Sequence, residues 1–593
     1  MDAAGHNQTS EFTWLSVPKN PSAVLRSLKL LIPPDGARGL TQLFYPTIAA
    51  ATILRETYSS LERKKAKMAM MGVSNWYDSA RPQKSVMETS KPAFNLAPTC
   101  SESAPKYSSA LEPPSIWYGT GYALSYSGPV GALICFLIVG IDVFFVMQSL
   151  GEMCTMYPTP GAFTEMAGRF LDPAFAFALG WNYFYLWISN LSNEYNGLSI
   201  VLGLWNQAHV PSYGWILLGW AFFQCTALLP VTAYGEMEFW FASWKVLCVL
   251  GGFVVAILLN TGAISDGSGY IGFRYWRDPG PFAHGIGGFA RTLVLAAVYY
   301  CGTEMVAVTA GESRAPKRDL PAAIRQSFAR IFVVFLGMVF FASLICPADD
   351  PSFLTAESKS GLSPWTIALV RAGWAGAGNL VNVVILTANL SAINSSIYIA
   401  SRTLLSLAKL GRAPAFFAAT TPRGVPVRAV VFSNTLGLIS LMNVGTKAGQ
   451  VFSYLVTISG AATFVAWAAI GVMHLRFRRA WLRQGRAVED LPFRALWYPW
   501  GAVFVAVINV FFVLIQGYQT LSPFKAADFV VAYVVIVVFV VLAAGWKVGK
   551  GTRWVRLEEM DLVSGTREDL PGMSNVEEKK AGLLLKTRRF FFA

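Results

Sequence analysis

Residues 529–546 read FVVAYVVIVVFVVLAAGW, a continuous stretch without a single charged side chain. A helix rises 1.5 Å per residue, so about 20 such residues cross a hydrocarbon core roughly 30 Å thick. Soluble cores rarely need blocks of this kind. The stretch therefore predicts a helix that spans a membrane.

Similar apolar blocks recur along most of the chain. We predict eleven complete spans, at 128–150, 174–204, 214–232, 239–260, 290–310, 329–347, 376–407, 428–444, 451–475, 499–520 and 527–547. The blocks are apolar on every side, whereas the strands of a membrane β-barrel alternate over about ten residues. A helix also satisfies its own backbone groups in lipid. The sequence therefore predicts an all-α polytopic membrane protein.

The composition supports this class and argues against several others. Only 14% of the 593 residues are charged, whereas an ordinary globular domain has about 25%. The net charge of +14 does not indicate nucleic-acid binding, because the basic residues lie beside apolar spans, where they fix topology and meet membrane lipid. The seven cysteines show no metal spacing. No catalytic or phosphate-binding motif is visible, so we expect neither enzymatic activity nor a cofactor.

The loops predict the orientation. Three connections rich in Lys and Arg, around 311–330, 401–428 and 476–494, should face the cytoplasm by the positive-inside rule. The connections between them carry fewer basic residues, and the exception is 261–291, whose three arginines should face outward. This alternation predicts that both termini lie in the cytoplasm.

Polar residues inside spans are costly in lipid and mark candidate functional sites. Glu304 lies deep in the 290–310 span and follows Tyr300-Cys301-Gly302-Thr303. A glycine beside small polar residues is a place where a helix can break, and a broken helix exposes backbone groups to a small polar ligand near the midplane. Alternatively, Gly302 only permits close helix packing and Glu304 forms a structural pair. We favour the functional interpretation.

Two other charged residues in spans each allow two interpretations. Glu194 either faces the same cavity as Glu304 or caps a kink near the outer end of its span. Lys245 lies six residues into the 239–260 span. Its ammonium group either extends to the inner interface or is desolvated and carries protons through the transport cycle.

The span at 376–407 is unusually polar. It carries hydrogen-bonding side chains at Thr387, Asn389, Ser391, Asn394, Ser395 and Ser396. Such groups commonly hold membrane helices together, and they can also line a site. Asp142, near the centre of the 128–150 span, has no partner that the sequence identifies.

Short motifs occur in a fixed order along these spans. They include Gly151-Glu152-Met153, Trp181-Asn182-Tyr183, Tyr234-Gly235-Glu236, Gly302-Thr303-Glu304, Ala310-Gly311-Glu312, Arg423-Gly424-Val425-Pro426 and the run from Glu559 to Gly565. From about Gly119 to Gly565, this ordered set resembles the yeast-type (fungal) amino acid permeases of the amino acid/polyamine/organocation transporter superfamily.

The resemblance implies a five-plus-five inverted-repeat transporter fold with about twelve spans, the first and sixth broken around a central amino acid site. The implied function is import of amino acids by proton symport with alternating access, most simply at the plasma membrane. The residues on matching motifs that would bind substrate are Glu304, Tyr300, Gly302, Thr303, Glu194, Ser391, Asn394 and Ser395. Lys245 matches a lysine that in relatives replaces a sodium ion and supports proton coupling.

The first span departs from the family pattern. Only its second half is recognisable, as Gly119-Thr120-Gly121 followed by Gly128-Pro129, and the preceding Glu112-Pro113-Pro114-Ser115 cannot continue a span. The first span is therefore incomplete, without the glycine-rich half that binds the substrate carboxylate in relatives. Two explanations remain: an altered or mis-spliced gene product attached to a permease body, which we favour, or a variant that uses another segment there.

These observations divide the chain into three regions. We expect a cytoplasmic, disordered segment unlike the family at 1–115, a membrane permease domain at 116–547 and a cytoplasmic tail at 548–593. The sequence determines neither the transported amino acid nor the oligomeric state. Two alternatives to a transporter stay open: an amino acid receptor that does not transport, and an inactive remnant that lacks half of its first span.

Overall fold

The computed structural model describes residues 116–159, 161–205, 210–229, 231–264, 269–310, 316–351, 353, 363–374, 376–422, 424–444, 448–521 and 523–566. The segment predicted to be disordered, 1–115, lies outside them. Helices make up the regular structure of the described residues, and the one extended feature among them is an isolated bridge between Leu521 and Phe524. The prediction of an all-α chain is confirmed.

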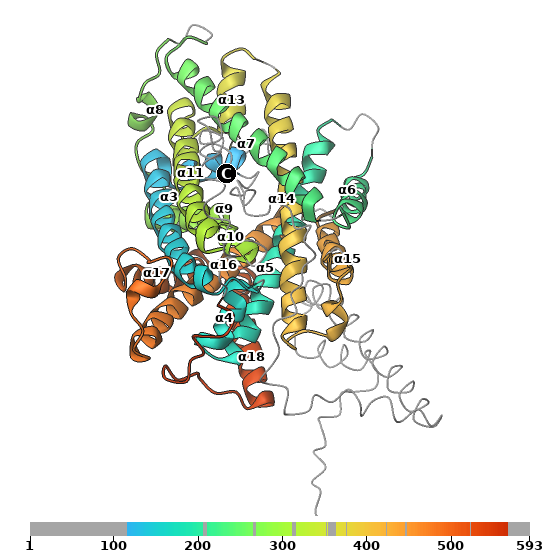
Figure 1. Cartoon of the computed structure of the whole chain (residues 1–593). Helices are drawn as coiled ribbons and strands as arrows, with labels where there is room; N and C mark the ends of the chain where they lie inside the picture. Colours follow the sequence, from blue (N-terminus) through green and yellow to red (C-terminus); the bar gives the residue numbers. More distant parts are fainter. Residues whose placement is uncertain are drawn as a thin grey trace, which may run out of the picture. The chain divides into compact units, whose positions relative to one another are not determined.

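The helices follow one another along the chain with short connections (Figure 1). Their bounds are α3 (Ile116–Met156), α4 (Ala162–Phe170), α5 (Pro173–Gly203), α6 (Ser212–Thr226), α7 (Val231–Asn260), α8 (Arg274–Arg277), α9 (Gly285–Tyr300), α10 (Met305–Ala310), α11 (Pro316–Ile345), α13 (Pro364–Arg371), α14 (Ala377–Lys409), α15 (Val427–Leu436), α16 (Ala448–Arg483), α17 (Trp500–Ile515) and α18 (Ala526–Lys550). Short 3-10 helices occur at Ala415–Ala418, Gly437–Val444, Val488–Asp490 and Tyr518–Thr520.

Each of the eleven predicted spans coincides with helical structure. Six helices of the described chain are long and apolar enough to cross a membrane, and three shorter apolar helices accompany them, at Phe332–Ile345, Val427–Met442 and Trp500–Ile515. The chain is thus a polytopic membrane protein. The boundaries differ most at α11, which begins at Pro316, thirteen residues before the predicted start at 329.

The span predicted at 290–310 is broken, as its glycine indicated. α9 ends at Tyr300, Gly302 has a φ of 98°, and α10 begins at Met305. A positive φ is easily adopted by glycine and strained for residues with a Cβ. Residues 301–304 therefore leave the helix, and their buried backbone joins the end of α9 to the start of α10.

α3 contains a second break, at Gly128. This residue has φ 76° and ψ 172°, and Pro129 after it cannot donate a backbone hydrogen bond. The loop at 281–283 closes the break: Pro281 O accepts from Val130 N at 3.1 Å, and Ala283 N donates to Ser127 O at 3.1 Å. The recognisable half of the first span is thus a separate helical arm, 116–127, whose Gly119 lies against the ring of Tyr299.

The helices with the most buried surface form the centre of the bundle. α5 packs against α14 and α16, and α3 packs against α9 and α11 (Figure 1). In α14 and in α16, 72% of the most apolar stretch of 18 residues is buried. In α18 the buried share of the corresponding stretch is only 11%. Most valines of α18 therefore face outward, where lipid is their natural solvent, and Val535 is buried.

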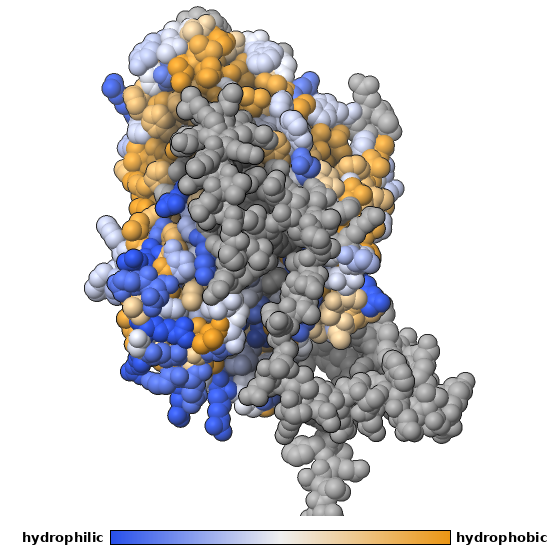
Figure 2. Space-filling view, in the orientation of Figure 1, coloured by the Kyte–Doolittle hydropathy of each residue, from blue (hydrophilic) through white to orange (hydrophobic). Residues whose placement is uncertain are grey.

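The visible surface divides by hydropathy. Figure 2 shows hydrophobic residues over the upper and middle part of the molecule and hydrophilic residues gathered at the lower end, near α4, α17 and the end of α18. This end carries the basic connection after α16, with Arg483 and Arg486. The distribution is typical of a protein that spans a bilayer.

Candidate functional site

The break between α9 and α10 is organised around Glu304. This carboxylate is 1% exposed. Its Oε2 accepts from the backbone N–H of Gly302 at 3.1 Å and from Nε1 of Trp467, on α16, at 3.3 Å, while its Oε1 accepts from the hydroxyl of Tyr183, on α5, at 3.4 Å. Glu304 therefore holds the broken segment against α5 and α16.

Two neighbours complete the broken segment. The hydroxyl of Tyr300 donates to Phe136 O at 3.3 Å, and its ring stacks on Phe335 with centroids 4.5 Å apart. Tyr300 is thus held between α3 and α11. Thr303 is buried, and its hydroxyl has no hydrogen-bond partner among the described residues. An unpaired buried hydroxyl can meet a polar ligand at little desolvation cost.

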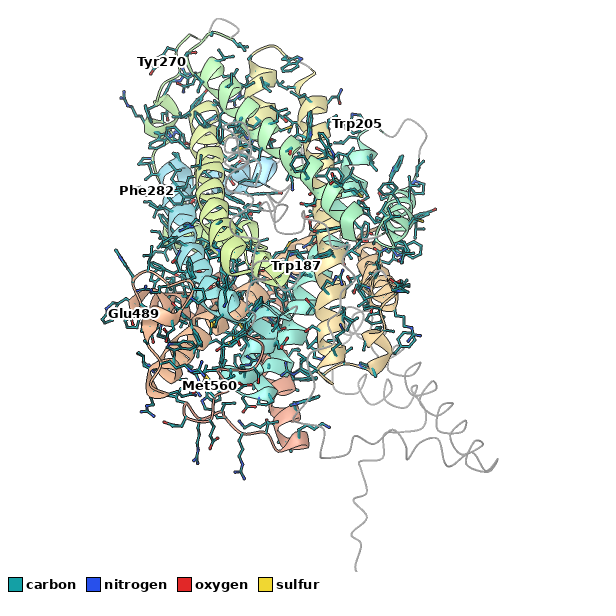
Figure 3. All side chains as sticks on the ribbon, in the orientation of Figure 1. Trp187, Trp205, Tyr270, Phe282, Glu489 and Met560 are labelled. Carbon is teal, nitrogen blue, oxygen red and sulfur yellow. The ribbon has the colours of Figure 1, made fainter. Side chains whose placement is uncertain are left out.

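α5 contributes residues to the break that the sequence alone did not indicate. Besides Tyr183, the side-chain amide of Asn190 lies 3.9 Å from the sulfur of Cys301. Trp187 lies in the middle part of the bundle (Figure 3). Its ring packs edge-on against Tyr183, with ring centroids 6.1 Å apart. Glu194 is half-buried farther along the same helix. It lies eleven residues beyond Tyr183, about 16 Å of helix, so Tyr183 is the α5 side chain that reaches Glu304.

A second polar cluster lies where α7 crosses α14. Lys245 is only 4% exposed, so its ammonium group does not extend to an interface. Its Nζ donates to Ser391 Oγ at 2.9 Å and lies 3.9 Å from Oε1 of Glu238. The hydroxyls of Ser391 and Ser395 both donate to Glu238, each at 3.2 Å. Asn394 is buried on the same helix.

The structure therefore groups most of the predicted site residues, but not Glu194, in two places. Tyr300, Gly302, Thr303 and Glu304 meet at the break, and Lys245, Ser391 and Ser395 meet at the crossing of α7 and α14. Both groups combine buried charge with hydrogen-bonding side chains, which is expensive in lipid unless it serves a function.

Comparison with known proteins identifies what kind of protein carries these clusters. Residues 112–558 match the family model described as amino acid permease. The chain belongs to the amino acid permease family. It is a member of a transporter family and not an enzyme.

Individual relatives of this permease come from yeast and bacteria. The general amino acid permease AGP3 of Saccharomyces cerevisiae is 43% identical over 459 residues, which cover 77% of this chain and 82% of the yeast protein. The lysine-specific permease of the same yeast is 36% identical over 464 residues, 76% of each chain. The histidine permease HisP of Lactococcus lactis is 34% identical over 445 residues, 75% of this chain and 92% of the bacterial one.

Asp142 of the permease has a partner that the sequence did not reveal. The side-chain amide of Asn509, on α17, donates to both carboxylate oxygens, at 3.0 and 2.9 Å. Both residues are fully buried. The pair joins α3 to α17.

The Gly151-Glu152-Met153 motif lies at the end of α3. Glu152 is fully buried and is paired with Arg478, while Nε2 of His474 lies 3.1 Å from its Oε1. The backbone N–H of Ala495 donates to it at 2.8 Å. This cluster fixes α3 to α16 and to the connection before α17.

The segment after α18 packs onto the body of the permease. Leu562 and Met560 are buried. Leu562 O accepts from the hydroxyl of Tyr157 at 3.0 Å, and Arg169 donates to Ser564 O at 2.6 Å. The run from Glu559 to Gly565 therefore holds the ends of α3 and α4.

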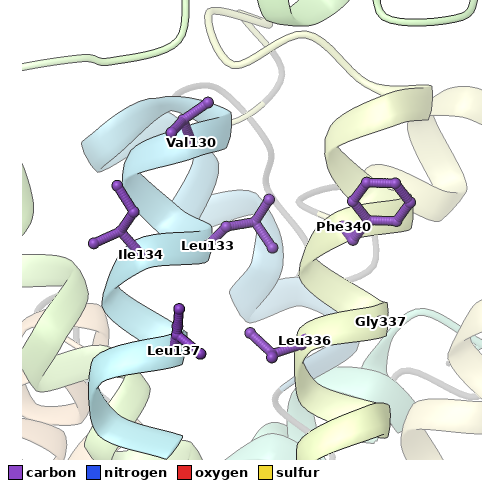
Figure 4. A pocket seen from close by; sticks show the side chains of 7 residues that line it. All are labelled: Val130, Leu133, Ile134, Leu137, Leu336, Gly337 and Phe340. Atoms are coloured by element: carbon purple, nitrogen blue, oxygen red, sulfur yellow. The ribbon is translucent and has the colours of Figure 1, made fainter.

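An apolar groove of about 420 Å³ lies between α3 and α11 (Figure 4). Its lining consists of Val130, Leu133, Ile134, Leu137, Leu336, Gly337 and Phe340. No side chain in this lining can bind the charged groups of an amino acid. The groove is therefore not the substrate site.

Proposed function

We propose that this permease imports amino acids by proton symport with alternating access. The observation that carries the proposal is the buried break at residues 301–304 beside Glu304. Broken membrane helices expose backbone oxygens and helix ends to small charged ligands near the midplane. Family membership supports amino acids as the transported class.

The proposed substrate site uses the end of α9. The carboxyl end of a helix carries partial negative charge, which favours an ammonium group. The α-ammonium of the substrate would bind there beside Glu304, Gly302 and Thr303, and Tyr300 would close over it. The remaining proposed contacts are Glu194 from α5 and Ser391, Asn394 and Ser395 from α14.

Proton coupling is assigned to Lys245. A buried ammonium group in the low-dielectric interior costs free energy unless it is paired, so a change in its partners during transport would change that cost. Replacing Lys245 with Met should leave a permease whose uptake no longer depends on outside pH. An unchanged pH dependence would remove Lys245 from the coupling mechanism.

We also propose how the permease lies in the membrane. About twelve spans would form two five-helix inverted repeats and an additional pair, with residues 116–547 as the transport domain and both 1–115 and 548–593 in the cytoplasm of a plasma-membrane protein. The basic, hydrophilic end of the surface in Figure 2 supports this orientation.

Counterflow separates this proposal from its competitors. Cells are loaded with unlabelled amino acid, and entry of labelled amino acid is followed. A transporter exchanges the two pools. A receptor binds label without exchange, and an inactive remnant does neither.

A further inference from the structure

We propose that Glu238 is a second proton-binding residue of the coupling site, connected to Lys245 by the hydroxyl of Ser391. The proposal rests on the proposed proton symport and adds a residue to it. It assigns the coupling site to a relay of three side chains on α7 and α14 rather than to a lone lysine.

The geometry of the cluster is that of a relay. Lys245 Nζ lies 2.9 Å from Ser391 Oγ, and Ser391 Oγ lies 3.2 Å from Oε1 of Glu238. The direct separation between Nζ and Oε1 is 3.9 Å, too long for a hydrogen bond. The serine hydroxyl accepts from the lysine and donates to the carboxylate, so it bridges the two charges.

The helices packed most extensively against α7 are α11, α13 and α14. Their charged groups bind other partners or lie away from Glu238. On α13, Arg371 pairs with Asp350. The part of α11 at Phe332–Ile345 has no charged residue. On α14, Arg402 binds Gly424 O beyond Ser395. Within the described structure, the groups that act most strongly on Glu238 are therefore Lys245, Ser391, Ser395 and Asn394.

The transfer conserves atoms and charge. Lys245 gives a proton to Ser391 Oγ as the serine gives its hydroxyl proton to Glu238. One N–H and one O–H bond break, and two O–H bonds form, one on the serine and one on the carboxyl group. The ion pair becomes a neutral amine and a neutral acid, and the loss of separated charge lowers the electrostatic cost inside the bilayer.

The direction of the relay suits import. Glu238 precedes Lys245 by two helical turns, about 10 Å of α7. The loop charges place the beginning of α7 at the cytoplasmic end of its span. The backbone of Glu238 therefore lies on the cytoplasmic side of that of Lys245, and the transfer itself covers the 3.9 Å between Nζ and Oε1.

The first test compares variants in permease-deficient cells that express the full chain. In Glu238→Gln, we expect accumulation driven by the proton gradient to fall about tenfold more than counterflow does, a difference equivalent to ~1.4 kcal/mol. In Ser391→Ala, which also removes a proposed substrate contact, both should fall, and accumulation should fall further than counterflow. Ser391→Thr, which keeps the hydroxyl, should recover most of the accumulation. Thr387→Val is the matched control, because it removes a hydroxyl one turn away on α14 that contacts Trp244 and not the relay.

Equal losses of accumulation and counterflow would overturn the relay and would mean that the cluster only stabilises the fold. If proton-driven accumulation is normal in Glu238→Gln, the relay is wrong and the proposed symport stands.

A second measurement covers the case in which the chain transports nothing. Infrared difference spectra of the purified chain between acid and neutral pH should contain a carboxylic acid C=O band that Glu238→Gln lacks and Ser391→Ala shifts. Absence of any Glu238-dependent band would overturn the relay independently of transport.

Discussion

At the scale of single residues, Glu304 carries the most contacts at the break. Its two oxygens accept three hydrogen bonds, from Gly302, Tyr183 and Trp467. A glutamine offers one carbonyl oxygen in place of two, so at least one of these donors loses its acceptor. Hydrogen bonds to a charged group contribute about 1.5–3 kcal/mol each.

Glu304→Gln should therefore lower amino acid uptake by at least about tenfold, since each ~1.4 kcal/mol is a factor of ten. Surface labelling of the variant should show normal amounts in the membrane. Uptake at the level of the parent chain would exclude Glu304 from the transport mechanism.

The Asp142–Asn509 pair leads to a prediction about stability. In Asn509→Leu, the buried carboxylate loses both side-chain hydrogen bonds, and we expect a loss of about 1–3 kcal/mol in unfolding free energy. The double variant Asp142→Leu/Asn509→Leu should recover part of this loss, because no polar group is then left unpaired. Thermal unfolding in detergent measures both. A double variant less stable than Asn509→Leu would contradict this explanation.

At the scale of helices, the break depends on Gly302. Its φ of 98° is strained for any residue with a Cβ. Gly302→Ala should favour a continuous α9–α10 helix, in which the backbone groups of 301–304 bond within the helix and not to a ligand. We expect it to lower uptake about tenfold, for a strain of roughly 1–2 kcal/mol. Gly251→Ala is the control, because a Cβ there has nothing within 4 Å. If both variants transport alike, the break is not required.

A second prediction concerns the start of α5. Burial raises the pKa of Asp172, but hydrogen bonds from Lys547, the backbone of Ala174 and Thr552 lower it more, so the pKa of this carboxyl lies below its usual value. A group with a lowered folded-state pKa adds stability above its unfolded-state pKa, and this stability is lost as the pH falls through the folded-state pKa.

The parent chain should therefore unfold at a higher temperature than Asp172→Asn near neutral pH. The difference should stay constant down to about pH 5 and shrink below about pH 4. Thermal unfolding across this pH range checks the prediction. A difference that grows in acid would mean that the carboxylate destabilises the fold.

The sequence predicted helices well because the signal is local. An apolar block such as 529–546 forms a membrane helix whatever its neighbours are, and Gly302 between polar residues marks a break within its own segment. Partners were harder to predict, because they depend on packing. Asp142 and Asn509 lie 367 positions apart, and Glu238 becomes the partner of Lys245 only because α14 brings Ser391 between them. In the sequence, Tyr183 and Trp467 are indistinguishable from other aromatic residues of a membrane helix. Only the fold brings their polar atoms to Glu304.

At the scale of the whole molecule, two of the buried polar clusters in the described part of the permease contain the proposed site residues. In the proposed mechanism, the α9–α10 break binds the amino acid and the crossing of α7 and α14 carries the proton. α5 connects them, since it packs on α14 and its Tyr183 binds Glu304. A movement of α5 and α14 relative to the break would change both clusters together, which is what coupled transport requires.

The central claim is tested most directly by uptake of a labelled amino acid mixture into cells that lack their own permeases and express this chain as written. Uptake is compared at acid and neutral outside pH, with and without a protonophore. Proton symport predicts uptake that is faster at acid pH and collapses with the protonophore. Good surface expression without any uptake would contradict the account and direct attention to a receptor or an inactive permease.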